Sequence, residues 1–143
     1  MQLETCAFFE KVFGKSFNAR RPLFLSNLDL GGYNKEFKLA FEFEGDLIKH
    51  KVCNQQKVKL ISIPRDVHCR EEKERYILDW LVLNGFSRYV IRYYKLERIR
   101  EQLLLCTVDD LKEIGYEMQI VTTARYRDDM IDQLCLGLQS KTR

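Results

Sequence analysis

The sequence contains few of the residues that interrupt regular structure. Its 143 residues include only two prolines and seven glycines, and no stretch is rich in Gly, Ser or Gln. Because disordered segments are usually rich in such residues and poor in apolar ones, extensive disorder is not expected. The apolar share of 45% and the charged share of 31% are close to globular averages. The length is that of one ordinary domain or two small ones.

Long apolar runs are also missing. The longest mainly apolar stretches, residues 77–83 and 103–106, are far shorter than the roughly 20 residues that a membrane-spanning helix needs. The first residues do not resemble a secretion signal, because Glu4 stands where such a signal carries positive charge and Glu10 and Lys11 interrupt the apolar part. We therefore expect an intracellular protein, cytoplasmic or nuclear, that has no membrane partner.

The residues that usually carry catalysis or bind metals form no motif. The sequence has two histidines but no Gly-rich phosphate loop, Ser-centred elbow or His-Glu metal helix. His50 and Cys53 would point to opposite faces of a strand, which disfavours a shared metal ion. The five irregularly spaced cysteines are expected to be small buried apolar residues of a reducing compartment. We predict that the protein is not an enzyme and has no metal, cofactor or small-molecule substrate.

The net charge of +3 is small and unevenly distributed. Residues 1–73 hold 13 Lys and Arg against 10 Asp and Glu, whereas residues 74–143 hold 11 of each. Basic nucleic-acid-binding domains usually have a much larger positive excess. The overall charge therefore does not by itself indicate a nucleic-acid partner.

The first half of the chain combines a helical pattern with a strand pattern. Cys6, Phe9 and Phe13 recur at spacings of three and four, which predicts a helix over residues 4–13 that ends at Gly14. Apolar and polar residues then alternate over residues 37–44, which predicts a half-buried strand.

Two further strands are expected after it. The Gly45-Asp46 pair is typical of a two-residue hairpin loop, so residues 47–53 are expected to form a returning strand. Residues 58–63 are expected to form a third strand that ends before Pro64. Residues 1–70 are thus predicted to form a small antiparallel β-meander with an N-terminal helix, followed by a polar connector.

The second half has a helical period. Ile77, Trp80 and Leu81 predict a helix that ends at Gly85. Further helices are expected after Ser87, around residues 103–105, from Thr107 to Gly115, and over residues 123–139. The predicted fold class is α+β, with one domain at residues 1–70 and a helical domain at residues 74–139.

Residues 74–139 also carry the motifs of a known family. The motifs are Ile77-x-x-Trp80-Leu81, Gly85-Phe86-x-x-Tyr89-x-x-x-Tyr93, and Leu104-Leu105-x-Thr107-x-Asp109-Asp110-Leu111-Lys112-x-Ile114-Gly115-Tyr116. Their spacing from Trp80 to Tyr116 needs no gap, and this region resembles a sterile alpha motif (SAM) domain. The resemblance implies a five-helix bundle and covers under half of the chain. Two departures are Arg98-Ile99-Arg100 in place of I-D-G, and about five extra residues before Arg125-Tyr126-Arg127, which stands in place of G-H-R.

The resemblance implies a function in protein association. SAM domains commonly bind one another head to tail, with an acidic surface against the basic start of the last helix. Matching residues here are Asp109, Asp110, Glu113 and Glu117 on the acidic side, and Arg125 and Arg127 on the basic side. A simpler interpretation is that the aspartates only cap their helix and the arginines are only solvated. We predict that the protein is an interaction adaptor or scaffold that undergoes homo- or hetero-association. Its expected partner is another protein, such as one with a SAM domain.

Two other features allow alternative functions. A basic stripe could contact RNA phosphates, as in some SAM domains, and comprises Arg88, Arg92, Lys95, Arg98 and Arg100. The apolar insertion at residues 118–121 is interpreted either as a docking loop or as a segment that folds back onto the N-terminal sheet.

Overall fold

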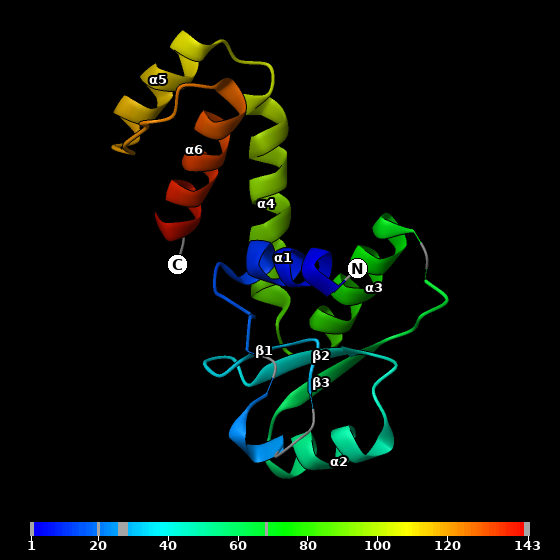
Figure 1. Ribbon diagram of the computed structural model, residues 1–143. Coiled ribbons are helices and arrows are strands. Elements are labelled where there is room, and N and C mark those ends of the chain that lie inside the picture. Colours follow the sequence, from blue (N-terminus) through cyan, green and yellow to red (C-terminus); the bar gives the residue numbers. More distant parts are fainter. Residues whose placement is uncertain (1, 20, 26–28, 68, 142–143) are drawn as a thin grey trace. The chain divides into compact units, whose positions relative to one another are not determined.

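The computed structural model describes residues 2–19, 21–25, 29–67 and 69–141 (Figure 1). Within these residues the fold is α+β, with six α-helices, one 3-10 turn (Leu23–Leu25) and one three-stranded sheet. The chain divides into two compact units, residues 1–87 and residues 88–143, which we call the N-terminal and the C-terminal unit. The division follows Ser87, whereas the sequence suggests one between residues 70 and 74.

The first helix is confirmed and packs on the sheet. Helix α1 (Gln2–Phe13) is followed by Gly14, whose backbone N–H donates to the Glu10 carbonyl at 2.7 Å. The α1 rings Phe9 and Phe13 are buried, and the Phe9 ring stacks on Phe41 with centroids 4.7 Å apart. The helical spacing of aromatic residues therefore builds one face of the core.

The three strands do not form the expected meander. Strand β1 (Gly32–Asn34) pairs antiparallel with β2 (Leu39–Phe43), but β2 pairs parallel with β3 (Lys59–Ile63) in the order β1-β2-β3. Parallel strands cannot be joined by a tight hairpin and need a crossover segment. The predicted all-antiparallel meander is therefore wrong, and the segment between β2 and β3 is a crossover.

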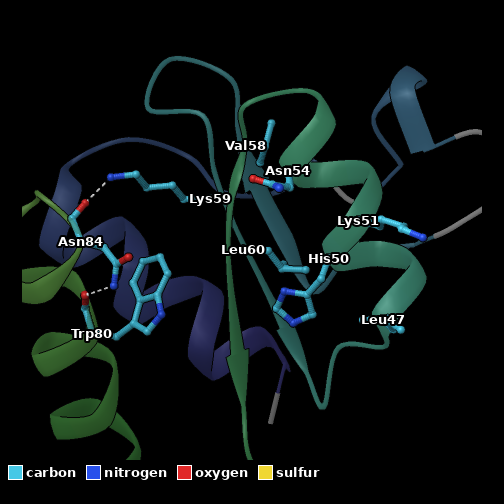
Figure 2. A pocket seen from close by; sticks show the side chains of 9 residues that line it. All are labelled: Leu47, His50, Lys51, Asn54, Val58, Lys59, Leu60, Trp80 and Asn84. Carbon is cyan, nitrogen blue, oxygen red and sulfur yellow. Dashed lines mark hydrogen bonds between the residues drawn. The ribbon is translucent and has the colours of Figure 1, made fainter.

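Helix α3 (Arg70–Leu83), the expected first helix of the SAM-like domain, packs on β3 in the N-terminal unit. The Tyr76 hydroxyl donates to the Ser62 carbonyl at 3.1 Å. After the helix, the Lys59 ammonium donates to the Asn84 carbonyl, and the Asn84 amide donates to the Trp80 carbonyl at 2.8 Å (Figure 2). The predicted end of the helix at Gly85 is confirmed, because Gly85 has φ of 93°, a conformation that disfavours other residues.

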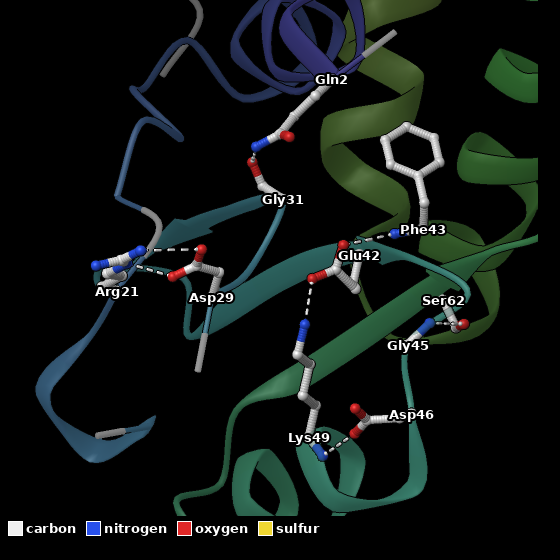
Figure 3. Close-up of polar contacts among 10 residues, drawn as sticks. All are labelled: Gln2, Arg21, Asp29, Gly31, Glu42, Phe43, Gly45, Asp46, Lys49 and Ser62. Atoms are coloured by element: carbon white, nitrogen blue, oxygen red, sulfur yellow. Dashed lines mark hydrogen bonds and ion pairs between the residues drawn. The ribbon is translucent and has the colours of Figure 1, made fainter. Parts of the chain in front are cut away.

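The crossover is a helix, not the predicted returning strand. Helix α2 (Leu47–Gln55) begins at Asp46, whose carboxylate accepts a hydrogen bond from the Lys49 backbone N–H at 2.8 Å. Gly45-Asp46 is therefore a helix start and not a hairpin loop. The Lys49 ammonium lies 2.8 Å from a Glu42 carboxylate oxygen, which connects α2 to β2 (Figure 3).

The sheet is covered on both faces. Helices α1 and α3 lie on one side and α2 on the other (Figure 1). On the α2 side, Ala40 and Leu60 pack with Cys53 in a buried cluster. The expectation of a half-buried β2 is therefore wrong, because its supposed solvent face carries the buried Ala40 and the Glu42–Lys49 pair.

The C-terminal unit contains fewer helices than expected. Helix α4 (Ser87–Leu103) runs without interruption for 17 residues and is followed by α5 (Val108–Glu117) and α6 (Arg127–Lys141). A separate helix at residues 103–105 is absent from the described chain, so residues 74–139 contain four helices and the predicted five-helix bundle is wrong. The reason is local, because Arg98-Ile99-Arg100 contains no helix-breaking residue where the family has I-D-G.

The core of this unit comes from the end of α4 and from α5 and α6. Leu103, Leu111, Ile131 and Leu134 are buried together. Leu104 is 47% exposed, because the continuous α4 places Leu103 inward instead. Gly115 was expected to end its helix but lies buried inside α5, and the last helix begins four residues later than predicted, at Arg127.

Candidate functional site

An acidic face lies on the outer side of α5. Residues spaced three, four or seven apart share one side of a helix, so Asp109, Glu113, Tyr116 and Glu117 lie close together. All four are exposed, whereas Leu111 and Gly115 on the opposite side of α5 are buried. No basic side chain of the described residues forms an ion pair with the carboxylates of Asp109, Glu113 and Glu117. We call Asp109, Glu113 and Glu117 the acidic face.

The fourth predicted acidic residue, Asp110, has a structural role. Its carboxylate accepts the Thr107 backbone N–H at 3.1 Å, and the Thr107 hydroxyl accepts the Asp110 backbone N–H at 3.2 Å. This reciprocal pair is a capping box that satisfies donors at the start of α5. The cap interpretation therefore holds for Asp110. Its carboxylate already accepts a hydrogen bond within the cap, so we do not count it in the acidic face.

The start of α6 is not the strongly basic surface that the resemblance implies. Arg125 is exposed, but the Arg127 guanidinium donates through Nε to the Cys106 carbonyl at 2.9 Å. Asp128 and Asp129 occupy the first turn of the same helix. The charges of two arginines and two aspartates thus cancel at this helix end. The aspartates also interact favourably with the positive end of the helix dipole.

A basic face lies along α4. Arg88, Lys95 and Arg98 are exposed and Arg92 is half-buried. The Arg88 and Arg92 guanidinium groups lie 4.7 and 5.3 Å from the centre of the Tyr89 ring, and Arg88 also donates to the Tyr89 hydroxyl at 2.7 Å. These contacts order the two arginines through cation–π attraction. We call Arg88, Arg92, Lys95 and Arg98 the basic face.

Arg100, the fifth predicted basic residue, points elsewhere. Its Nη1 donates to the Asp132 carboxylate of α6 at 2.6 Å, so it joins two helices of the C-terminal unit. Burial acts to lower the pKa of Arg100, but the hydrogen bond and charge of Asp132 raise it above the usual value. Arg100 is therefore a charged structural residue.

Exposed apolar side chains accompany the charged faces. On α4, Ile91 and Tyr94 are each 56% exposed, and Tyr116 on α5 is 87% exposed. Helical spacing places Ile91 and Tyr94 next to Lys95 and Arg98. Arg and Tyr combined with exposed aliphatic groups are typical of protein interfaces. The outward direction of Tyr94 is not evident from the sequence, since an amphipathic pattern cannot show that a tyrosine at its margin faces outward.

The apolar insertion folds onto its own unit. The Ile120 backbone N–H donates to the Gly115 carbonyl at 2.8 Å, and a Cβ on Gly137 would lie 2.7 Å from Ile120 Cγ2. Ile120 thus packs into the core between α5 and α6, where only glycine gives it room. Val121 remains exposed beside it.

Within the described residues, no group of three or more His, Cys, Asp or Glu side chains could hold a metal ion. No cysteine in them forms a disulfide. The helices described here are all too short or too polar to cross a bilayer. Comparison with models of known protein families, with curated proteins and with solved structures found no match to this chain.

Proposed function

We propose that the chain is a non-enzymatic interaction adaptor whose C-terminal unit associates with other proteins, including further copies of itself. The observation that carries this proposal is the presence of two exposed faces of opposite sign on separate helices. The acidic face lies on α5 and the basic face on α4, and Arg88, Lys95 and Arg98 form no ion pair with a described carboxylate of their own unit.

Opposite faces on one unit favour a head-to-tail contact. The acidic face of one copy can meet the basic face of the next, and each copy then keeps one face available. Such heterologous contacts extend into filaments or close into rings. Charge complementarity steers the encounter, and the exposed Ile91, Tyr94 and Tyr116 supply apolar area to bury.

The SAM resemblance supports association but suggests a different basic surface. In the family pattern the acidic surface meets the start of the last helix, here Arg125 and Arg127. The Arg127 guanidinium is hydrogen-bonded to the Cys106 carbonyl, and two aspartates follow Arg127 in the chain. We therefore assign the basic role to α4. The acidic role stays with α5, as the sequence predicts.

Light scattering after size-exclusion chromatography tests the proposal. The mass of the wild type should rise with concentration, and Glu113→Lys or Lys95→Glu should each weaken association by roughly tenfold or more, because like charges meet across the contact. Lys35→Glu, a reversal at an exposed site of the N-terminal unit, is the matched control and should leave association unchanged. A wild type that stays monomeric at every concentration contradicts self-association.

RNA binding is the alternative function. It is supported by the helical spacing of Arg88, Arg92 and Lys95, which places them on one side of α4. If these residues contact phosphates, affinity for an RNA hairpin falls steeply with salt, with a slope that grows by roughly 0.7 to 0.9 for each phosphate contact. Lys95→Glu would then reduce both affinity and slope, whereas Glu113→Lys would not reduce either. This outcome in a monomeric protein would favour RNA over protein association.

A further inference from the structure

One edge of strand β3 pairs with no other strand of the described residues. The Lys59 N–H donates to the Lys38 carbonyl at 2.9 Å, and the Ile63 carbonyl accepts the Glu44 N–H at 2.9 Å, so both residues face β2. Because backbone groups of successive residues point to opposite sides of a strand, the N–H and carbonyl of Leu60 point to the outer edge. Among the described residues, no strand pairs with β3 there.

The outer edge opens into a hollow of the N-terminal unit. Its volume is about 530 Å³, within the range of ligand-binding clefts. Figure 2 shows Trp80 and Asn84 of the α3 segment on one side of β3, and His50 and Asn54 of α2 on the other. Of β3, only Lys59 and Leu60 line the hollow, and further along the edge the Ser62 carbonyl already accepts the Tyr76 hydroxyl.

The lining combines basic and apolar groups. Lys51, Lys59 and His50 belong to it, and none of its nine residues is an aspartate or glutamate. Lys59 is fixed by the Asn84 carbonyl, whereas Lys51 is exposed. The half-buried Trp80 presents an aromatic surface near Leu60. A fitting occupant therefore has main-chain donors and acceptors, an apolar side chain and a negative charge.

We infer that this hollow binds an extended acidic segment of a partner protein, which adds a strand to β3. The segment pairs with the main chain of Leu60, rests an apolar side chain on Trp80 and directs a carboxylate toward Lys51. In strand addition the main-chain hydrogen bonds supply affinity and the pockets for alternate side chains supply specificity. This inference gives the N-terminal unit a binding role separate from the charged faces of the C-terminal unit.

The single tryptophan of the chain makes a direct test possible. The probe is an acetylated heptapeptide of alternating valine and glutamate, titrated to millimolar concentration into the full chain. We expect a change in Trp80 fluorescence and shifts of the Leu60 and Trp80 amide signals in nuclear magnetic resonance spectra. Lys51→Glu should weaken binding about fivefold, the scale of one exposed charge pair. Lys35→Glu, the same reversal outside the hollow, should leave affinity unchanged.

Two altered peptides separate strand addition from simple charge attraction. Methylation of alternate peptide nitrogens removes donors and should abolish the shifts, and replacement of glutamate by lysine should weaken binding at least as much as Lys51→Glu does. Equal binding of either altered peptide, or an absence of shifts with the acidic peptide, would overturn the inference. Shifts of the same residues with a thymidine oligonucleotide but not with the peptide would also overturn it, because the hollow would then recognise nucleic acid.

Discussion

The Thr107 hydroxyl and the Asp110 backbone N–H are hydrogen-bonded at 3.2 Å, and the Asp110 carboxylate returns the contact to the Thr107 N–H at 3.1 Å. The pair holds the start of α5, the helix that carries the acidic face. The sequence predicted Thr107 as the cap of this helix, and the structure confirms it. The same helix therefore combines a residue needed for folding with residues available for binding.

Loss of this cap should destabilise the protein. We expect Thr107→Ala to lower the free energy of unfolding by about 1 kcal/mol, because the first-turn donors of α5 lose an acceptor. Urea unfolding followed by circular dichroism measures the change. Asp109→Asn, an exposed change in the same turn, should cost less than half as much. Equal losses in the two variants would mean that the cap contributes nothing specific.

The Glu42–Lys49 pair should behave as a coupled unit. Both side chains are largely shielded, with 16% and 17% of their surface exposed. Glu42→Leu and Lys49→Met should each cost about 2 kcal/mol, because each leaves one shielded charge without its partner. The double variant should cost clearly less than the sum. Additive losses in urea unfolding would show that the two charges do not interact.

Gly137 should not tolerate a methyl group, although alanine is the better helix former. A Cβ there would lie 2.7 Å from Ile120 Cγ2. We expect Gly137→Ala to lower the unfolding free energy by about 1 to 3 kcal/mol through overpacking, which exceeds the helix gain. In an Ile120→Ala background, Gly137→Ala should cost clearly less, because the added methyl no longer meets Ile120 Cγ2. A Gly137→Ala variant more stable than the wild type would contradict this packing.

Stability should decrease in alkaline solution. Burial raises the pKa of the Cys53 thiol, partly offset by Lys49, and burial with a smaller effect of Cys53 raises the pKa of Tyr33. Because the folded chain holds these protons more tightly, their contribution is fully present below about pH 8.5 and is lost as the pH rises through the folded-state pKa. Urea unfolding in reductant at about pH 7.5 and about pH 10 should show a smaller decrease for Cys53→Ala than for the wild type. An identical decrease in both proteins would assign the effect to other groups.

Local signals were sufficient for several elements. The aromatic spacing of Phe9 and Phe13 predicted α1, and Gly85 and Thr107 marked real helix ends. These features depend only on residues within one or two helical turns, so a short stretch of sequence is enough to predict them. The β2 and β3 segments were also located, because their apolar residues are needed in the core whatever their direction.

Strand direction and the α2 helix were not predictable in this way. Residues 47–53 hold two apolar pairs, Leu47-Ile48 and Val52-Cys53, separated by three polar residues, which is not a clear strand or helix period. Asp46 is as typical of a turn as of a helix cap. Only the parallel pairing of β2 with β3 decides between a strand and a crossover helix. That pairing depends on contacts far apart in the sequence, which local patterns do not contain.

The candidate site was predictable only in part. Exposed carboxylates on α5 follow from helical spacing, so the acidic face could be found from the sequence. The engagement of Arg127 with Cys106 and of Arg100 with Asp132 depends on how α6 packs against the rest of its unit. Residue type alone therefore overestimated the basic start of α6 and the length of the basic stripe.

The central claim is that the acidic and basic faces of different molecules bind each other. The most direct test mixes Glu113→Lys, which retains the basic face, with Lys95→Glu, which retains the acidic face, and measures mass by light scattering. Each variant alone should associate far more weakly than the wild type, and the equimolar mixture should form at least a 1:1 dimer, because the intact basic face of the first variant meets the intact acidic face of the second. A mixture that stays monomeric while the wild type associates would contradict the claim.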